Sequence, residues 1–281
     1  MPRLWPSEEK RRVPPTDRDA AIGRPPDCPP GWRTGPPDFV GVGAQKAGTT
    51  WWFRLIEAHP AVHAIEGQRP ELHFFDRYLD GWPSREDIDL YHRFFPRPAG
   101  AMAGEKTPNY MACHWVPEML REAAPDARLI CILRDPIARY VSGRTHDEHR
   151  TGAAAGTVEA SRDVADEMRW VGDAFAKGLY AQQLRWLLAA FPSEQVLVLQ
   201  YERCVRDPGA ALARTYRFLG LPDHRLEEAE LTRPRNVTRH EKLDLDARRR
   251  ALLVELYAPE VRQLSTMVPD LDLSLWPDFL E

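Results

Sequence analysis

The feature that most constrains this chain is the stretch of residues 38–52, in which a short apolar run leads into a glycine-rich turn and then into a second apolar run. Phe39, Val40 and Val42 predict a buried strand. Glycines in the turn let the backbone approach a ligand closely, because they carry no Cβ. Thr49 and the residues after it predict a helix. The stretch is therefore expected to form a strand, a tight turn and the first turns of a helix.

This turn is also a candidate anion site. A helix N-terminus presents unpaired N–H groups and the positive end of the helix dipole. Lys46 adds a full positive charge there, and the hydroxyls of Thr49 and Thr50 add hydrogen-bond donors. We therefore expect the loop to bind a phosphate or a sulfate. The alternative is an ordinary glycine-rich connection that binds nothing.

The spacing of the loop narrows the choice of ligand. Residues 43–50 resemble the P-loop pattern G-x-x-x-x-G-K-[ST], except that Thr49 stands in the lysine position and the lysine comes earlier, at Lys46. P-loop NTPases use that lysine on the β- and γ-phosphates, with the Ser or Thr on Mg²⁺. The displaced lysine predicts a different phosphorylated ligand. The arrangement K-x-G-T is similar to the 5′-phosphosulfate loop of sulfotransferases.

A second anion site is predicted at Arg134 and Ser142. Arg134 follows the apolar run 128–133, and open α/β sheets place their ligands at the carboxyl ends of strands. Asp135 and Pro136 then predict a helix start, with Ser142 two turns along it. Two anion sites at two strand ends suit a ligand with phosphate at both ends. The alternatives are an Arg134–Asp135 ion pair and a Ser142 on plain helix surface.

The rest of the chain alternates between apolar runs and amphipathic segments. Apolar runs predict further strands at residues 128–133 and 196–199. Periodicity and capping residues predict helices that begin at residues 49, 116, 136, 180, 208 and 247. Strands that alternate with helices predict an α/β fold, here a P-loop-like three-layer sandwich with a central parallel sheet.

Less regular segments carry weaker predictions. Residues 62–65 predict a short strand, and residues 78–95 predict short helices on the surface. A strand of small residues is expected just before residues 105–110. Trp276 and Phe279 are expected to pack the C-terminal tail.

Composition excludes several classes of function. The chain has 281 residues, of which 43% are hydrophobic, and a formal net charge of −4, so neither nucleic acid nor an anionic membrane surface is an expected partner. No window approaches the roughly 20 apolar residues of a membrane span, and the N-terminal residues hold no apolar signal region. The four cysteines lack metal-ligand or C-x-x-C spacing, which predicts reduced thiols and a cytoplasmic location.

Two regions are predicted along the chain. Residues 1–37 are rich in Pro and Arg, which excludes a helix or a central strand. This N-terminal extension is either an arm that packs on the domain through Trp5 and Trp32 or a disordered tail. Residues 38–281 are predicted to form the functional domain. The sequence carries no signal for an oligomeric state.

Several ordered motifs resemble a single family. They are the loop around Lys46, residues 71–76 (Glu-Leu-His-Phe-Phe-Asp), residues 105–108, and residues 133–136 with Ser142. They occur in the same order as in the sulfotransferase domain of the heparan sulfate 3-O- and N-sulfotransferase type, which includes many bacterial relatives. The resemblance runs from about residue 38 to the C-terminus, and residues 201–202 and 218–221 also look like bacterial members.

The resemblance implies a co-substrate and a role for each matched residue. The sulfuryl donor would be 3′-phosphoadenosine 5′-phosphosulfate (PAPS). Its 5′-phosphosulfate is expected in the cofactor-binding loop of Lys46, Ala47, Gly48, Thr49, Thr50 and Trp51, and its 3′-phosphate at Arg134 and Ser142. Glu71 falls on the catalytic base, His73 and Asp76 on its supporting polar residues, and Lys106 on a lysine that lines the reacting centre.

The chemistry agrees with these roles. Transfer to an alcohol needs a base for the hydroxyl proton, which Glu71 can supply within hydrogen-bond reach. Lys46 is expected to stabilise the charge that grows on the leaving phosphate oxygen. A sulfuryl group carries less charge than a phosphoryl group, so no metal is predicted. If residues 71–75 are extended, Glu71, His73 and Phe75 share one face. The alternatives are a Glu71 paired with Arg69 or Arg77 and a satisfied core His73.

The sequence departs from the family pattern at several positions. Pro70, with Arg69 before it, stands where eukaryotic members have lysine, Ala47 replaces a common glycine, and Trp51 and Trp52 are bulky. The basic residues 233–240, which include Arg239, lie where the family closes over the nucleotide, and we expect Arg239 to bind the cofactor. The alternative is a solvated basic loop.

These observations predict a sulfotransferase that acts on a hydroxyl, or less readily an amine, of a carbohydrate, glycolipid or other small metabolite. Two alternatives stay open at this point. A small-molecule kinase on a modified P-loop would need ATP and Mg²⁺, and the displaced Lys46 argues against it. A non-catalytic nucleotide-binding module would bind the donor without turnover, and the presence of Glu71 and Lys106 argues against it.

Overall fold

The computed structural model describes residues 23–65, 71–79, 81–151, 172–233 and 243–280. Within them, a parallel sheet runs in the order β2-β1-β3-β4, formed by β1 (Phe39–Gly43), β2 (Gly104–Lys106), β3 (Arg128–Leu133) and β4 (Val196–Gln200). All of β1 is buried, and so is β3 after its first residue. Helices cover both faces of the sheet, which explains why these strands are continuous apolar runs.

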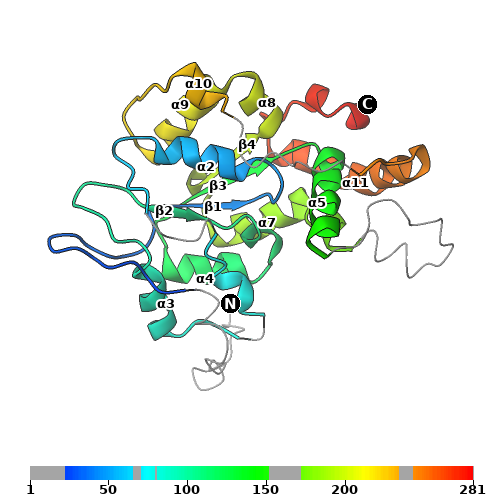
Figure 1. The fold of residues 1–281 in the computed structure, drawn as a ribbon. Helices are drawn as coiled ribbons and strands as arrows, with labels where there is room; N and C mark the ends of the chain where they lie inside the picture. The colour runs from blue at the N-terminus through cyan, green and yellow to red at the C-terminus, as the bar shows by residue number, and fades with distance from the viewer. Residues whose placement is uncertain (1–22, 66–70, 80, 152–171, 234–242, 281) are drawn as a thin grey trace.

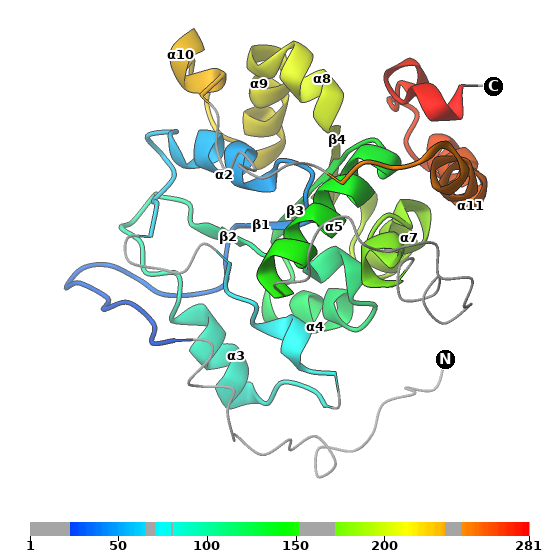
Figure 2. The ribbon, with the colours of Figure 1, turned by 45° about the vertical axis from the view of Figure 1, so that its right-hand side comes forward.

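Figures 1 and 2 show the two helix layers on either side of the sheet. One layer holds α2 (Thr49–Glu57), α8 (Tyr201–Arg206) and α9 (Pro208–Leu219), with the short α10 (Glu228–Leu231) next to them. The other holds α4 (Val116–Ala123) and α7 (Tyr180–Ala190), with α3 (Arg85–His92) packed outside α4. α5 (Pro136–Thr151) stands at one side of the sheet, and α11 (Ala247–Met267) packs on α5 and α7. The predicted three-layer α/β architecture is confirmed.

Five turns of 3-10 helix complete the described elements. They are η2 (Phe75–Arg77), η3 (Tyr110–Ala112), η4 (Ser193–Gln195), η5 (Leu273–Leu275) and η6 (Pro277–Phe279). Trp276 and Phe279 are buried, as predicted for the tail.

The strand order creates a crevice beside β1. The chain leaves β1 through α2 to reach β2 on one side, and then passes through α4 to β3 on the other side. α2 and α4 lie on opposite faces of the sheet (Figure 1). Open α/β sheets bind ligands where successive connections diverge in this way, at the carboxyl ends of the strands. The fold therefore predicts a ligand site formed by the loop after β1 and the end of β3.

Local capping fixes the helices that border this crevice. The Asp135 carboxylate accepts a hydrogen bond from the Ala138 N–H (2.7 Å), and Pro136 occupies the first turn of α5. At α9, Asp207 caps the N-terminus, and Gly220 ends the helix in the left-handed conformation with φ 72°. Both helix starts were predicted, that of α5 from Asp135 and Pro136 and that of α9 from Pro208.

Other predictions differ from the structure. Residues 62–65 form no strand, because Val62 makes only an isolated bridge with Met102. The segment 78–95 is not confined to the surface: among others, its Tyr91 and Phe95 are buried in the core. Helices α8 and α10 were not predicted. The strand expected before Glu105 includes it, since β2 is Gly104–Lys106.

The described part of the N-terminal extension contacts the domain. Arg33 forms an antiparallel bridge with Arg97, and the Trp32 ring packs edge-on against His63, with 4.7 Å between ring centroids. Trp5 lies outside the described residues. Within the described ranges, no helix is both long enough and apolar enough to cross a bilayer.

Candidate functional site

A cavity of about 890 Å³ opens at the carboxyl edge of the sheet. Its walls come from the loop after β1, the first turn of α2, the start of α5 and the C-terminal segment. Predicted site residues that line it are Lys46, Gly48, Thr49, Thr50, Trp51, Glu71, Arg134 and Ser142. Segments far apart in the sequence thus meet in one cavity, as the strand order predicts.

The loop after β1 has a backbone that only certain residues accept. Gly48 caps α2 with φ 83°, and a Cβ on it would lie 2.7 Å from the Tyr201 ring. Lys46 also has a positive φ, at 69°. No side chain caps the N-terminus of α2, and its first turn carries no acidic residue. The N-terminus of α2, which is the positive end of its dipole, therefore faces the cavity without a competing carboxylate in its first turn.

Ala47 contributes differently from its neighbours. Its side chain is buried, and its N–H donates a hydrogen bond to the Ala44 carbonyl (3.2 Å). It is not among the residues that line the cavity. Arg239 and the rest of the segment 234–240 lie outside the described residues.

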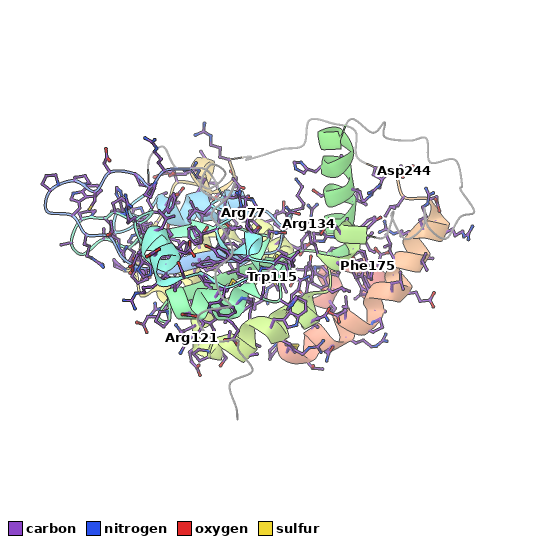
Figure 3. The ribbon with its side chains drawn as sticks, turned by 90° about the horizontal axis from the view of Figure 1, so that it is seen from below. Arg77, Trp115, Arg121, Arg134, Phe175 and Asp244 are labelled. Atoms are coloured by element: carbon purple, nitrogen blue, oxygen red, sulfur yellow. The ribbon has the colours of Figure 1, made fainter. Side chains whose placement is uncertain are left out.

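Arg134 connects the two predicted anion sites. Its guanidinium donates a hydrogen bond to the Lys46 carbonyl (3.2 Å) and lies 5.1 Å from the centroid of the Tyr201 ring. Asp135 does not share in this arrangement, because its carboxylate caps α5. Figure 3 shows Arg134 beside α5, the helix that carries Ser142, and Phe175 between α5 and α11. Both predicted 3′-phosphate residues thus face the cavity that the loop also lines.

The far wall of the cavity contains contacts that sequence reasoning missed. Glu202 accepts hydrogen bonds from the Asp135 N–H (2.9 Å) and from the Trp276 indole N–H (2.9 Å). Arg250 of α11 makes a bidentate ion pair with Asp278, at 2.7 and 3.1 Å. Glu202 therefore ties the start of α5 to the C-terminal segment. Its position in the matched pair 201–202 was the only signal in the sequence.

Glu71 belongs to a chain of charged side chains at the edge of the cavity. One carboxylate oxygen lies 3.1 Å from the Lys106 Nζ, and the other lies 3.2 Å from the His73 Nε2. The His73 Nδ1 lies 2.6 Å from the Asp76 carboxylate, which also accepts a hydrogen bond from the Asn109 amide (2.9 Å). The structure thus brings together Glu71, its predicted supporting residues His73 and Asp76, and Lys106.

The charges of this chain follow from its contacts. Hydrogen bonds to Asp76 and then Glu71 raise the pKa of His73 to about 9, although burial acts against them. His73 is therefore an imidazolium that donates to two carboxylates at neutral pH. Burial raises the pKa of Glu71, but hydrogen bonds and charges from His73 and Lys106 outweigh it, so the pKa lies below its usual value. Glu71 is ionised and able to accept a proton.

Residues 71–75 are not extended, which is the condition under which Glu71, His73 and Phe75 would share one face. His73 has φ 52°, in the left-handed region, and Phe75 begins η2, so alternate side chains do not share a face. Phe75 is buried in the core, whereas the side chain of Glu71 is 30% exposed. This backbone conformation depends on tertiary contacts. The hydroxyls of Thr107 and Tyr110, far along the chain, accept hydrogen bonds from the backbone N–H groups of residues 73 and 74.

The partners of Glu71 and His73 among the described residues bear on the alternative roles of both side chains. Glu71 pairs with Lys106 and His73, while Arg69 lies outside the described ranges. His73 has partners on both ring nitrogens, but its side chain is 34% exposed and lies at the cavity edge rather than in the core. Over the described ranges, no group of three His, Cys, Asp or Glu side chains forms a metal-binding cluster.

Comparisons with known proteins agree with this geometry. Residues 36–243 match the sulfotransferase domain family. The human (Homo sapiens) heparan sulfate glucosamine 3-O-sulfotransferase 6 is 33% identical over 206 residues, which cover 73% of this chain and 58% of that protein. The human bifunctional heparan sulfate N-deacetylase/N-sulfotransferase 3 is 29% identical over 69% of this chain and 23% of its own length. The chain thus spans less than two thirds of either relative.

A solved structure extends the similarity to the whole architecture. The crystal structure of a sulfotransferase from Alicyclobacillus acidocaldarius superimposes with a TM-score of 0.63 and 26% identity, over 86% of this chain and 98% of that one. With the family match over residues 36–243, this means that the chain belongs to the sulfotransferase domain family.

Proposed function

We propose that this chain transfers a sulfuryl group from PAPS to a hydroxyl group of a carbohydrate or another small hydroxylated acceptor. One observation carries the proposal: the anion-binding loop, Arg134 with Ser142, and the ionised Glu71 all open onto one cavity. This arrangement suits a donor with phosphate at both ends and a base next to the group to be transferred. The cavity volume also falls within the range of small-molecule sites.

The residues present fit the donor. Lys46 and the N-terminal turn of α2 would hold its 5′ end, with hydroxyls of Thr49 and Thr50 as further donors. Arg134 and Ser142 would hold its 3′-phosphate, for which the planar guanidinium is well suited. PAPS, when bound, supplies the sulfuryl group. We keep Arg239 as a further proposed nucleotide contact.

The side chains at the cavity edge would carry out the proton transfer. Glu71 would take the proton of the acceptor hydroxyl. His73 and Lys106 would orient Glu71 through its two oxygens, and Asp76 would fix the ring of His73. Lys46 would place its charge where negative charge develops on the leaving oxygen, a stabilisation worth about 3–4 kcal/mol in comparable sites. These residues need no metal for these steps.

The relatives favour a carbohydrate acceptor. One is named for 3-O-sulfation of heparan sulfate glucosamine, and a less similar one for N-sulfation. We therefore propose a hydroxyl acceptor first and an amine second. The match to almost the full length of a bacterial structure supports the bacterial type of the family. A cytoplasmic location is proposed as well, since all four cysteines are free.

Calorimetric titration with 3′-phosphoadenosine 5′-phosphate (PAP) in EDTA tests the donor site. We expect binding, and Arg134→Ala should weaken it about 10- to 100-fold, because a hydrogen bond to a charged group contributes about 1.5–3 kcal/mol. Arg121→Ala, on the outer side of α4, is the matched control and should bind PAP normally.

Transfer of radiolabelled sulfate from PAPS to a panel of sugars, glycolipids and amines then tests the reaction and identifies the acceptor. Binding of ATP that requires Mg²⁺, with no binding of PAP, would overturn the proposal in favour of a kinase. Binding of PAP without transfer to any acceptor would favour a non-catalytic module.

A further inference from the structure

A buried carboxylate that the mechanism above does not use lies next to Lys106. Glu105 is 3% exposed and does not line the cavity. It neighbours Lys106 in β2, and successive side chains of a strand point to opposite faces. Lys106 contacts Glu71, so Glu105 points away from the reacting groups. A buried carboxylate without a cationic partner needs hydrogen bonds to be tolerated.

Three hydroxyl groups supply those hydrogen bonds. The Tyr91 hydroxyl of α3 donates to Glu105 Oε1 (2.8 Å), and so does the Tyr110 hydroxyl of η3 (3.1 Å). The Thr107 hydroxyl donates to Glu105 Oε2 (2.8 Å). Burial raises the pKa of both tyrosines well above the usual value, so both keep the proton that they donate.

Two of these hydroxyls also hold the segment that carries His73. The Thr107 hydroxyl oxygen accepts the His73 N–H (3.2 Å), and the Tyr110 hydroxyl oxygen accepts the Phe74 N–H (3.0 Å). A hydroxyl has a single proton, which here goes to Glu105 in both cases. The carboxylate therefore takes both hydroxyl protons and leaves the two oxygens oriented to accept the backbone N–H groups. The Tyr91 hydroxyl differs, since it donates to Glu105 but accepts no N–H of this segment, although the Tyr91 ring packs against the Phe74 ring, with 5.0 Å between ring centroids.

The held backbone is one that the residue would not adopt unaided. His73 has φ 52°, which is uncommon for a residue other than glycine and is retained only where the surroundings enforce it. In this conformation its ring lies between Asp76 and Glu71. A continuous path of contacts therefore leads from Glu105 through Thr107 to His73 and Glu71.

We propose that Glu105 is a positioning residue for the reaction: its carboxylate orients the hydroxyls of Thr107 and Tyr110, which hold His73 in line with Glu71. The inference rests on the proposed function, because it assigns Glu71 as the base that must be held. The path also predicts a dependence on pH, since a protonated Glu105 would accept fewer hydrogen bonds and release one of the hydroxyls.

The pH range follows from the groups that face Glu105. Burial raises the pKa of Glu105 to about 7, against hydrogen bonds from Thr107, Tyr91 and Tyr110, and the charge of Asp76 in η2 raises it further. The carboxylate form, which holds the segment, is lost as the pH falls through about 7. Turnover should therefore decrease on the acid side of about 7, while PAP binding should not follow this decrease.

Glu105→Gln tests the proposal with the full-length chain. Glutamine keeps the size but places an NH₂ donor among three donating hydroxyls. We expect kcat to fall about 10- to 100-fold, the range for small errors in the placement of reacting groups. PAP affinity should be unchanged, and the decrease of kcat below pH 7 should disappear. A lower kcat with the same pH profile would show a merely structural role and overturn the proposal.

Two further variants separate positioning from stability. Thr107→Val should reproduce the loss of kcat, and Thr107→Ser, which keeps the hydroxyl, should restore it. Tyr91→Phe removes a hydrogen bond to Glu105 but no contact with residues 73 and 74. It should lower the melting temperature. Because the Tyr91 hydrogen bond lowers the pKa of Glu105, its loss should also move the acid-side decrease of kcat to higher pH, and kcat should stay near that of the unchanged chain at a pH well above this decrease. An equal loss of kcat in Tyr91→Phe would contradict the proposal.

Amide hydrogen exchange keeps the test independent of turnover. We expect faster exchange at His73 and Phe74 in Glu105→Gln, measured by NMR on labelled protein with PAP, but unchanged exchange in Tyr91→Phe. Unchanged exchange in Glu105→Gln would overturn the positioning role even in an active enzyme. Absence of PAP binding and of sulfate transfer by the unchanged chain would instead overturn the proposed function, and the exchange result would still be readable.

Discussion

The two ends of the cavity, where we propose that the nucleotide and the acceptor bind, are built in different ways. At the nucleotide end, the loop after β1 and the start of α5 follow directly from strands of the sheet, so short stretches of backbone place both the N-terminus of α2 and the side chains of Lys46 and Arg134. At the acceptor end, Glu71 lies in irregular backbone and depends on side chains from other segments, among them Lys106 and Thr107. We therefore expect PAP binding to be sensitive to the backbone of the loop as well as to its charged side chains, and turnover to be most sensitive to single side chains at the acceptor end.

The largest expected effect is at the acceptor end. Glu71→Gln removes the base but keeps a hydrogen-bonding side chain of the same size. We expect kcat to fall about 10²- to 10⁴-fold, the usual contribution of general base catalysis. The affinity for PAP, measured by calorimetry, should stay the same, since Glu71 serves the proton and not the phosphates. Full turnover in this variant would exclude Glu71 as the base.

The next effect is at the nucleotide end and concerns the backbone. Gly48→Ala places a Cβ 2.7 Å from the Tyr201 ring, at a residue with φ 83°. Such overpacking and strain cost about 1–3 kcal/mol in the free energy of unfolding, and the displaced loop should lose PAP affinity as well. Thermal melting and calorimetry measure both. Gly100→Ala is the control, because its φ is 81° but no atom lies within 4 Å of the added Cβ. Equal PAP binding in Gly48→Ala and Gly100→Ala would contradict a nucleotide site that depends on the backbone of this loop.

The same contrast explains what the sequence could reveal. The turn around Lys46, the strand before Arg134 and the cap at Asp135 are determined by neighbouring residues, so all three were predicted in place. The backbone at His73 could not be predicted, because its φ is set by hydroxyls more than thirty residues away. Glu105 belongs to one of the family motifs, but the sequence does not indicate its role, because its burial against Tyr91 follows only from the tertiary structure.

The charge of His73 gives a prediction of intermediate size. Its pKa is raised to about 9 from 6.5, so the folded chain binds more protons than the unfolded chain between these values. The stabilisation is complete below about 6.5 and is lost as the pH rises through about 9. We expect the melting temperature to fall over this range, and less steeply in His73→Asn. Identical slopes in the two proteins would show that His73 is not the titrating group.

The smallest expected effect tests how far the nucleotide end depends on an uncharged side chain. Ser142 offers one neutral hydroxyl on α5, next to the charged Arg134 in the same cavity. Ser142→Ala should weaken PAP binding only about 2- to 10-fold, because a neutral hydrogen bond contributes about 0.5–1.5 kcal/mol. The same variant should bind adenosine 5′-phosphosulfate, which lacks the 3′-phosphate, as well as the unchanged chain does. A loss as large as that of Arg134→Ala would mean that Ser142 orders the start of α5, and the nucleotide end would then depend on side chains much as the acceptor end does.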